Sequence, residues 1–469
     1  MSNYEVAVIG AGPGGYVTAI RCAQLGLKTI CIDKWINKEQ QASLGGTCLN
    51  VGCIPSKALL DSSHLYESIN KEASEHGFSV KTGNVDIAKL QSRKNIIIER
   101  MSKGIAGLFL KNKVDTLLGS AKLLDQHTIE VSVNDSEKEV IQAENIIIAT
   151  GSVPVELKQV SIEKSIVDNE GALAFDEIPA DLGIIGAGVI GLELGSVWRR
   201  LGAKVTIFEM SPDFLPMVDR EIAKEAFKIF KSQGLNIKLG CKVTNIENDE
   251  DYVSVTYEDS SGEDEIEFEK LIVAVGRKPN TDQLGIHELG IDFDNRGFIV
   301  VDEFCKTNIE NIYAIGDVTN GPMLAHRASK DGMTVAENIA GKNKTVNYQS
   351  IPWVMYTWPE IAWAGATEQK LKDKNISFKT GKFPFMANGR AHAMNCPKGM
   401  IKIIVSDEGT VLGVHIIGPN ASELIAAGVT AIKHQHSYTT TIDEIHAHPS
   451  LSEAFHEAAL DIEGRTIHF

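Results

Sequence analysis

One pattern occurs twice in this chain and restricts its fold more than any other feature. It is an apolar strand, a glycine-rich turn, a helix and a second strand that ends in an acid. The first copy consists of a strand at 4–9, the turn Gly10-Ala11-Gly12-Pro13-Gly14-Gly15, a helix at 16–25 closed by Gly26, and a strand at 28–32 followed by Asp33. Such glycines allow a pyrophosphate to rest on the helix N-terminus, and the acid bonds a ribose hydroxyl. The pattern predicts a dinucleotide site; an ordinary strand-to-helix turn is the alternative.

The second copy repeats this order. It consists of a strand at 182–185, the turn Gly186-Ala187-Gly188-Val189-Ile190-Gly191, a helix that ends at Leu201 before Gly202, and a strand at 204–208 followed by Glu209. An internal repeat of this kind indicates two nucleotide sites, one for a tightly held cofactor and one for an exchangeable cofactor. Glu209 should accept the 2′-hydroxyl of NAD and repel a 2′-phosphate, and no arginine occupies 210–212, so NAD is favoured over NADP. A solvated strand end is the alternative for Glu209.

Between the copies, residues 45–57 hold Cys48 and Cys53 beside several glycines. In a regular helix, residues five apart are separated by roughly 7.5 Å of rise, whereas a disulfide places its Cα atoms about 4.4–6.8 Å apart. A bridge therefore requires a distorted turn, which Gly52 permits, and a bridge in imperfect geometry is more easily reduced. The pattern favours a redox-active pair. Two unrelated thiols or half of a metal site are the alternatives, although no further Cys or His lies close enough in sequence to complete a metal site.

Composition indicates a soluble globular protein. The 469 residues are 43% hydrophobic and 23% charged, and this length is typical of roughly three domains. The net charge of -16 argues against nucleic-acid binding. We expect no membrane span and no signal or transit peptide before the first strand. The seven cysteines, mostly isolated, favour a reducing cytoplasm, where a working disulfide is transient and catalytic.

Two further motifs lie in the second half. A strand within residues 307–317 ends in Gly316-Asp317; this acid could bind a ribityl or ribose hydroxyl, although Gly-Asp is also a common turn. From about residue 352 the pattern changes to strands at 399–405 and 410–417 and then to helices, which places a domain boundary near 350.

The carboxy-terminal motif is Ile445-His446-Ala447-His448-Pro449, followed by Glu453. Pro449 is expected to start a helix, with His448 just before it and Glu453 about one turn later. A carboxylate that orients an imidazole is typical of a general base. Two surface histidines that cap a helix explain the pattern equally well, and the residues alone do not choose between His446 and His448.

Together these motifs resemble the disulfide-containing flavoprotein reductases, the class I pyridine nucleotide-disulfide oxidoreductases, from about residue 4 to the last residue. Within this family the best match is the dihydrolipoamide dehydrogenases, the flavin subunits of 2-oxo-acid dehydrogenase and glycine-cleavage complexes. The resemblance implies an α/β fold with two Rossmann-like domains and a C-terminal α+β dimerisation domain. The implied domains are an FAD-binding domain at 1–150, an NAD-binding domain at 151–280, a central region at 281–350 that completes the FAD domain, and an interface domain at 351–469.

The resemblance also implies site residues. Cys48 exchanges with the substrate and Cys53 is the thiolate against the flavin. His448 is the base and Glu453 orients it, and this pair reaches the thiols of the other subunit. Lys57 lies near the reactive edge of the flavin and pairs with Glu193. The implied FAD residues are Gly10, Gly12, Gly15, Asp33, Lys57, Gly119, Thr150, Gly151, Ser152, Gly316, Asp317, Met323, Leu324, Ala325 and His326, and the implied NAD residues are Gly186, Gly188, Gly191, Glu193, Glu209, Val243 and Gly276. Asp33 stands where many members have Glu, and the shorter acid still accepts a ribose bond.

The expected activity is therefore oxidation of protein-bound dihydrolipoamide to lipoamide with reduction of NAD to NADH. The expected partners are a second copy of the chain and the lipoyl domains of the complexes, and not nucleic acid or a membrane. NADPH-dependent reduction of glutathione or mercuric ion is the nearest alternative. Glu209 argues against NADPH, and the C-terminus lacks the cysteine pair of a mercuric reductase. A non-catalytic flavoprotein subunit is a second alternative, against which Cys48, Cys53 and His448 argue.

Overall fold

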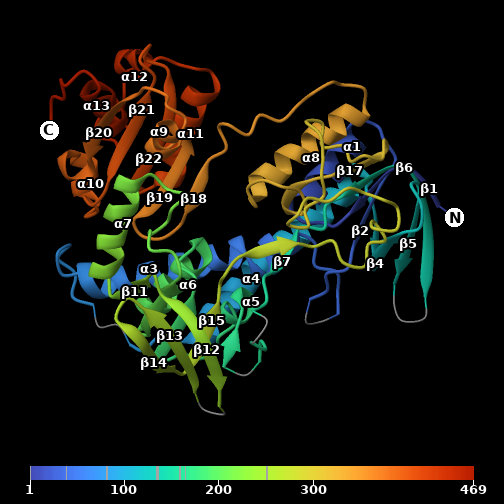
Figure 1. The fold of residues 1–469 in the computed structure, drawn as a ribbon, viewed down its shortest axis with the longest axis horizontal. Coiled ribbons are helices and arrows are strands. Elements are labelled where there is room, and N and C mark those ends of the chain that lie inside the picture. Colours follow the sequence, from blue (N-terminus) through green and yellow to red (C-terminus); the bar gives the residue numbers. More distant parts are fainter. Residues whose placement is uncertain are drawn as a thin grey trace. The chain divides into compact units, whose positions relative to one another are not determined.

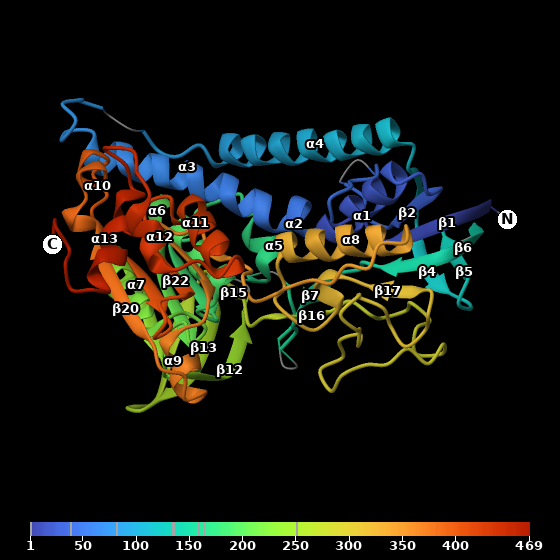
Figure 2. The same cartoon turned by 90° about the horizontal axis from the view of Figure 1, so that it is seen from above.

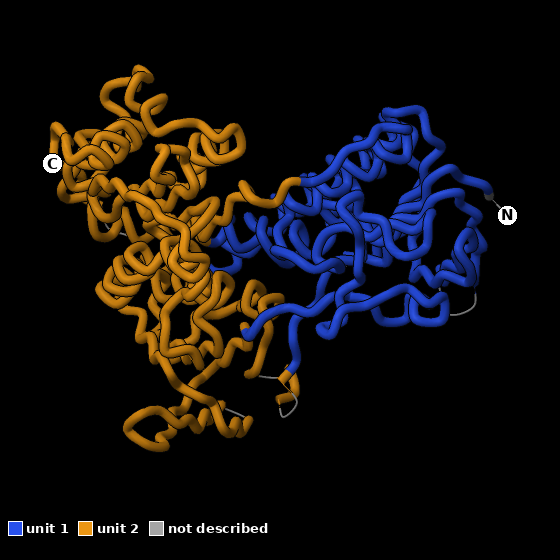
Figure 3. Tube along the Cα trace, turned by 45° about the horizontal axis from the view of Figure 1, so that its top comes forward, with its two compact units in different colours: residues 1–59, 86–156, 275–346 blue, residues 60–85, 157–274, 347–469 orange. Residues whose placement is uncertain are grey.

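The computed structural model describes residues 2–37, 40–80, 83–133, 137–157, 160–163, 165–249 and 252–469. Figure 1 labels its helices and strands, and Figure 3 shows that the chain divides into two compact units. Unit 1 consists of Met1–Leu59, Asp86–Glu156 and Val275–Val346, and unit 2 of Leu60–Val85, Leu157–Ala274 and Asn347–Phe469. Residues 38 and 39 of the polar segment after Asp33, and residues 81 and 82, lie outside the described chain.

A seven-stranded sheet forms the centre of unit 1, in the order β3-β2-β1-β6-β5-β4, with β17 paired to β6. Its strands are β1 (Ser2–Ile9), β2 (Thr29–Asp33), β3 (Asp115–Leu118), β4 (Ser120–Leu123), β5 (Thr128–Ser132), β6 (Lys138–Ile148) and β17 (Ile312–Ala314). β1 is parallel to both β2 and β6. Val6 and Val8 pack into one apolar cluster while Ala7 and Ile9 pack into another. Because β1 is buried on both faces, it has the continuous apolar sequence typical of a parallel sheet.

Helices cover this sheet. They are α1 (Pro13–Gln24), α2 (Gly46–Val51), the first residues of α3 (Cys53–Glu72), α4 (Ile87–Asn112) and α8 (Ala325–Ile339). Figure 2 shows α8 running beside α1. Small residues permit this close pairing, since a Cβ on Gly332 would lie 2.0 Å from Thr18 Oγ1 and one on Gly14 would lie 3.3 Å from Ala328 Cβ. A short ribbon of β7 (Ser152–Pro154) and β16 (Arg277–Pro279) completes unit 1.

Unit 2 contains a parallel sheet in the order β11-β10-β9-β15-β8. Its strands are β8 (Ile166–Val167), β9 (Asp181–Ile185), β10 (Lys204–Glu209), β11 (Leu235–Leu239) and β15 (Lys270–Val273), with the antiparallel strands β12 (Lys242–Asn248), β13 (Val253–Asp259) and β14 (Gly262–Phe268) forming a separate sheet. The helices of this part are α5 (Asn169–Ala172), α6 (Val189–Leu201) and α7 (Arg220–Ser232). The order β9–α6–β10 repeats β1–α1–β2, which confirms the predicted duplication.

The carboxy-terminal part of unit 2 is an antiparallel sheet in the order β18-β19-β22-β21-β20. Its strands are β18 (Trp353–Met355), β19 (Glu360–Gly365), β20 (Lys379–Pro384), β21 (Met400–Val405) and β22 (Val411–Gly418), and its helices are α9 (Glu368–Asp373), α10 (Gly389–Ala393), α11 (Ala421–Lys433), α12 (Tyr438–Asp443) and α13 (Glu453–Asp461). The α/β fold with a carboxy-terminal α+β part is therefore as expected, whereas the exact limits of the four domains stay a prediction.

Candidate active site

The first glycine turn has a shape that other residues cannot adopt without a clash. Gly10 has φ +104°, and a Cβ on it would lie 2.4 Å from Ala149 O. A Cβ on Gly15 would lie 1.8 Å from Gly10 O. Gly12 is the N-cap of α1, and Pro13 fills the first helical turn without needing a hydrogen-bond partner. No side chain caps this described end of the helix, so its backbone amides suit a phosphate group.

The acid at the end of β2 braces the same turn. Asp33 Oδ2 accepts a hydrogen bond from Ala11 N, and Asp33 Oδ1 accepts one from Trp35 N at 2.8 Å. Burial raises the pKa of Asp33, against the amide hydrogen bonds that favour its charged form. Since a carboxylate has about four acceptor positions, these two bonds leave acceptor capacity for a ribose hydroxyl.

The second glycine turn has the same geometry. Gly186 has φ +104°, and a Cβ on Gly191 would lie 2.1 Å from Gly186 O. Glu209 accepts hydrogen bonds from Ala187 N at 2.9 Å and from Ser211 N at 2.8 Å. The duplication thus extends to the hydrogen bonds of the two acids, and each turn fits a dinucleotide.

The two thiols lie on either side of a break between helices. α2 ends at Val51, Gly52 leaves the helical conformation, and α3 begins at Cys53. A Cβ on Gly52 would lie 2.8 Å from Thr47 O. The distorted turn predicted at Gly52 is therefore confirmed, and the close approach of Thr47 O leaves no room there for a side chain.

The structure holds the pair as two free thiols. The pKa of Cys48 is raised by its hydrogen bond with Cys53, then by burial and by the charge of Cys53, while Lys57 opposes the rise. Cys48 therefore keeps its proton in this arrangement, and Cys53 is the exposed member. An exposed thiol beside a partly buried one suits a pair that reacts with a substrate rather than a structural bridge.

The helix with Cys48 begins directly on the first glycine turn. Gly45 N donates to Ala11 O at 3.0 Å, and Gly46 has φ +60°. A Cβ on Gly46 would lie 2.6 Å from Gly12 Cα. No role for these two glycines had been predicted, although their adjacency before Cys48 is a signal for a close backbone approach.

Asp317 lies at the centre of a polar network in unit 1. Ser152 Oγ donates to Asp317 Oδ2 at 2.7 Å, and Arg277 Nε donates to Ser152 Oγ at 2.8 Å. Burial raises the pKa of Asp317, while Ser152, Arg277 and Arg327 oppose the rise. The structure thus joins two predicted residues, Ser152 and Asp317, directly, and adds Arg277, an arginine that no sequence pattern had singled out.

The turn that holds Thr150 and Gly151 is joined to residue 280. Thr150 Oγ1 donates to Asn280 O at 2.7 Å, and Asn280 N donates to Gly151 O at 2.9 Å. Asn280 is another residue that the sequence analysis missed, because its role depends on a contact across 130 positions.

The loop before α8 is held by a buried arginine. Arg327 NH2 donates to Thr319 Oγ1 at 2.6 Å and to Asn320 O at 3.2 Å, and its Nε pairs with Asp331 at 3.1 Å. Asp331 in turn accepts a hydrogen bond from Gly316 N at 3.3 Å. The predicted cofactor residues of this region lie where the loop joins α8. Met323 and Leu324 precede the helix, and Ala325 and His326 are its first two residues. The expected strand is shorter than predicted, because residues 316–318 form a 3-10 turn.

His448 and Glu453 are in contact. Glu453 Oε1 accepts a hydrogen bond from His448 Nδ1 at 2.9 Å, and Glu453 Oε2 accepts one from Ser450 N at 2.8 Å. Burial acts to raise the pKa of Glu453, but the Ser450 amide and His448 together hold it below its ordinary value. His446 instead lies beside His456, with ring centres 5.9 Å apart. The geometry therefore selects His448 as the histidine oriented by a carboxylate.

The prediction that a helix starts at Pro449 is wrong. α13 begins at Glu453, and the Ser450 amide donates its hydrogen bond to the Glu453 carboxylate instead of taking part in a helix that starts at Pro449.

Five other predicted residues lie elsewhere. Glu193 is buried in α6 and accepts a hydrogen bond from Tyr356 N at 2.9 Å, while Lys57 lies in unit 1, so their pairing stays a prediction. Gly119 N donates to Asp33 O at 2.9 Å. Val243 lies opposite Tyr257 in β12. Gly276 belongs to unit 1, whereas the second glycine turn belongs to unit 2.

The described residues contain neither a metal-binding cluster nor a helix suited to a membrane. No group of three or more His, Cys, Asp or Glu side chains there is arranged to hold a metal ion. None of the helices in the described ranges combines the length and apolar character that a membrane crossing requires.

Known proteins are similar to this chain over nearly its whole length. Residues 4–332 match the family described as pyridine nucleotide-disulphide oxidoreductase, and residues 351–459 match its dimerisation domain. The chain is 48% identical to a dihydrolipoyl dehydrogenase of Cupriavidus necator, over 99% of both chains. It is 44% identical to the mitochondrial dihydrolipoyl dehydrogenase 2 of Arabidopsis thaliana, over 99% of this chain and 91% of that protein.

A solved structure has the same fold. The HOCl-induced flavoprotein disulfide reductase RclA from Escherichia coli superposes with a TM-score of 0.86 at 27% identity, over 97% of this chain and 99% of that chain. Two glycine turns with their acids, a thiol pair beside the first turn and a carboxylate-held histidine occur in a chain that matches one family almost throughout. This chain belongs to the pyridine nucleotide-disulphide oxidoreductases.

Proposed function

We propose that this chain is a dihydrolipoyl dehydrogenase, which oxidises dihydrolipoamide to lipoamide and reduces NAD to NADH. The observation that carries the proposal is the position of the Cys48 helix on the first glycine turn, where Gly46 approaches Gly12. A thiol pair fixed against a dinucleotide site is suited to electron exchange with the bound cofactor. The names of relatives that are 44% and 48% identical over nearly the whole chain support the same activity.

The residues fit two dinucleotides. The first turn, Asp33 and the Ser152–Asp317 network would hold FAD, and the second turn with Glu209 would hold NAD. When bound, FAD supplies a two-electron carrier between the thiol pair and NAD. The remaining chemistry belongs to the protein's own side chains.

These side chains carry out thiol–disulfide exchange and proton transfer. His448 Nε2 takes the proton from one thiol of dihydrolipoamide, and the resulting thiolate attacks Cys48 Sγ of the oxidised pair. The Cys48–Cys53 bond breaks, and Cys53 leaves as a thiolate. The second substrate thiol then attacks the mixed disulfide, which releases lipoamide and leaves Cys48 reduced with a proton. Glu453 holds Nδ1–H, so that Nε2 is the basic nitrogen.

The proposed partners are a second copy of the chain and lipoyl domains, and the proposed location is the cytoplasm. The match of residues 351–459 to the dimerisation domain supports a homodimer, in which His448 and Glu453 would serve the thiols of the second copy. The substrate group would arrive on lipoyl domains of 2-oxo-acid dehydrogenase or glycine-cleavage complexes. The five cysteines outside the Cys48–Cys53 pair are buried, which supports the prediction of a chain without structural disulfides in a reducing cytoplasm.

The test is the initial rate of NADH formation with dihydrolipoamide. We expect NAD to be used at least ten times more efficiently than NADP. Cys53→Ser should abolish the reaction while the protein stays yellow, and Cys396→Ser, at a buried cysteine outside the pair, should keep it. A rate with NADPH and glutathione or mercuric ion, without one for dihydrolipoamide, would contradict the proposal.

A further inference from the structure

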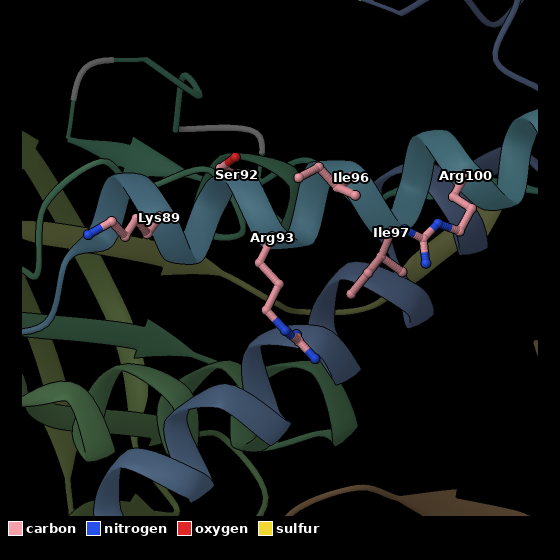
Figure 4. Close-up of a pocket in the computed structure, with 6 residues that line it drawn as sticks. All are labelled: Lys89, Ser92, Arg93, Ile96, Ile97 and Arg100. Carbon is pink, nitrogen blue, oxygen red and sulfur yellow. The ribbon is translucent and has the colours of Figure 1, made fainter.

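One face of α4 carries a basic and apolar stripe that the mechanism does not use. The stripe consists of Lys89, Ser92, Arg93, Ile96, Ile97 and Arg100, which line an open hollow of about 460 Å³ (Figure 4). Five of these residues follow the spacing of one helix face over three turns, with Ser92 beside them. We propose that this α4 basic face docks an acidic protein domain, the one that carries the dihydrolipoyl group. The inference rests on the proposed function and names the partner that would bring its substrate.

The charge of the face differs from that of the whole chain. The protein has a net charge of -16, yet three of the six lining residues are cations and none is an acid. Lys89 Nζ forms an ion pair with Asp86 Oδ2 at 3.0 Å, whereas Arg100 forms no ion pair with any described residue. Arg93 NH1 donates to Ala58 O at 3.2 Å, which fixes its guanidinium over α3. Charge complementarity therefore favours an acidic partner and disfavours a second copy of this acidic chain.

The apolar members suit a protein rather than a small anion. Ile96 is 51% exposed, and it lies beside Ile97 between the two arginines. Exposed apolar side chains flanked by arginine are typical of protein interfaces, where arginine is enriched. A free phosphate or carboxylate would contact the arginines but leave both isoleucines in water.

The position of the face indicates which acidic domain it takes. Ser102 is buried on the side of α4 opposite Arg100, since the two residues are about half a turn apart, and its Oγ lies 3.4 Å from Ser43 Oγ. Ser43 Oγ donates to Asn50 Oδ1 at 2.7 Å, and Asn50 lies in α2 two residues after Cys48. The buried side of α4 thus packs beside the helix with the exchanging thiol, and the basic face lies on the opposite side of α4, one helix diameter (~10 Å) away. A domain bound to the α4 basic face would therefore lie close enough for its dihydrolipoyl side chain to reach Cys48 over a short distance.

The experiment compares two forms of one substrate. The holoenzyme would be assayed with free dihydrolipoamide and with a purified, reduced, acidic lipoyl domain, for the wild type and for Arg100→Glu. We expect Arg100→Glu to raise KM for the domain about tenfold at low salt, while kcat and KM for free dihydrolipoamide stay unchanged. Added salt should raise the wild-type KM for the domain towards that of the variant. Lys111→Glu, the same charge change in the last turn of α4, is the matched control.

Other results would overturn the docking surface. Equal loss with both substrates would assign Arg100 to the chemistry or the fold, and no loss with either would leave the face without a role. A change from dimer to monomer in sedimentation would assign the face to a second copy. If the wild type failed with free dihydrolipoamide, the proposed function would fall; calorimetric titration of the acidic domain into wild type and Arg100→Glu would still test the docking. If Arg100→Glu lost its flavin, Arg100→Gln would take its place.

Discussion

Gly46 and Gly12 approach so closely that a Cβ on Gly46 would lie 2.6 Å from Gly12 Cα. The two residues are 34 positions apart, and each starts a helix: Gly12 caps α1, and Gly46 is the first residue of α2. The contact sets the Cys48 helix directly on the turn that is predicted to hold a cofactor pyrophosphate. Cofactor binding and thiol position therefore depend on the same backbone contact.

Replacing Gly46 by alanine should separate the helix from the turn. The side chain would meet backbone atoms and would also occupy φ +60°, a conformation that costs about 1 kcal/mol or more for a residue with a Cβ. We expect Gly46→Ala to lower both the flavin content per chain and the dihydrolipoamide-dependent rate, measured by absorbance and by NADH formation. Gly104→Ala is the control, since nothing lies within 4 Å of its Cβ position. Full flavin and full activity in Gly46→Ala would contradict this view of the contact.

Glu453→Gln should lower the rate. The Glu453 carboxylate accepts the hydrogen bond from His448 Nδ1 at 2.9 Å and so fixes the orientation of the ring. We expect kcat to fall about 10- to 100-fold, because the ring loses this orientation. Steady-state assays with dihydrolipoamide and NAD measure the loss, with the exposed Glu408→Gln as control. An unchanged kcat would show that Glu453 does not act through His448.

Glu209→Gln should weaken the discrimination between NAD and NADP. The carboxylate now accepts hydrogen bonds from Ala187 N and Ser211 N, and its charge repels a 2′-phosphate. With the neutral amide, we expect the ratio of kcat/KM for NAD to that for NADP to fall about tenfold or more. Asp33→Asn changes the matching acid of the first turn and should lower flavin retention without altering this ratio. If Asp33→Asn changed the NAD-to-NADP ratio and Glu209→Gln lowered flavin retention, the first turn would hold NAD and the second FAD, which would contradict the assignment.

Lys402 should be essential for the stability of unit 2. Its side chain is fully buried and pairs with Asp219, also fully buried, at 2.8 Å and with Glu221 at 2.7 Å. Lys402→Met would leave a buried carboxylate without its cation, at a cost of about 3–5 kcal/mol. Urea unfolding measures this loss, with the exposed Lys370→Met as control. Adding Asp219→Asn to Lys402→Met should recover part of it.

The pH dependence of this cluster has a definite sign. Burial lowers the pKa of Lys402, but its hydrogen bonds to Asp219, Glu221 and Glu368 raise it above its ordinary value overall. A raised folded-state pKa means that the contribution is complete at neutral pH and is lost as pH rises through that pKa. The stability difference between wild type and Lys402→Met should therefore be constant near pH 7 and shrink only in strongly alkaline solution.

The carboxy-terminal tail should detach in acid. Glu457 accepts hydrogen bonds from His468 Nδ1 at 2.7 Å and from Ile467 N at 3.0 Å. Burial acts to raise the pKa of Glu457, but these bonds hold it below its ordinary value. A depressed pKa gives stability that is present at neutral pH and lost as pH falls through the folded-state pKa. Amide exchange at Ile467 should therefore be slow at pH 6, after correction for intrinsic rates, and faster below pH 4. In Glu457→Gln, amide exchange at Ile467 should be fast at both pH values. Slow exchange in this variant would show that the Glu457 carboxylate does not hold the tail.

Much of this protein could be predicted from local patterns. The strands, glycine turns and acids of the two repeats occur within about 30 residues each, and the thiol pair and the His–Glu pair within six, so sequence spacing alone identifies them. These elements obey steric and hydrogen-bonding rules that depend only on near neighbours. The start of α13 was placed four residues early because the Ser450–Glu453 bond has no pattern of its own.

Tertiary structure decided what lies beside what. The approach of Gly46 to Gly12, the Arg277–Ser152–Asp317 network and the buried Lys402–Asp219 pair join residues that are 34, up to 165 and 183 positions apart. The choice of His448 over His446 also needed coordinates, since both lie within reach of a carboxylate in sequence. Sequence fixes the conformations that a short segment can adopt, whereas such contacts arise only when packing excludes every other arrangement of the segments.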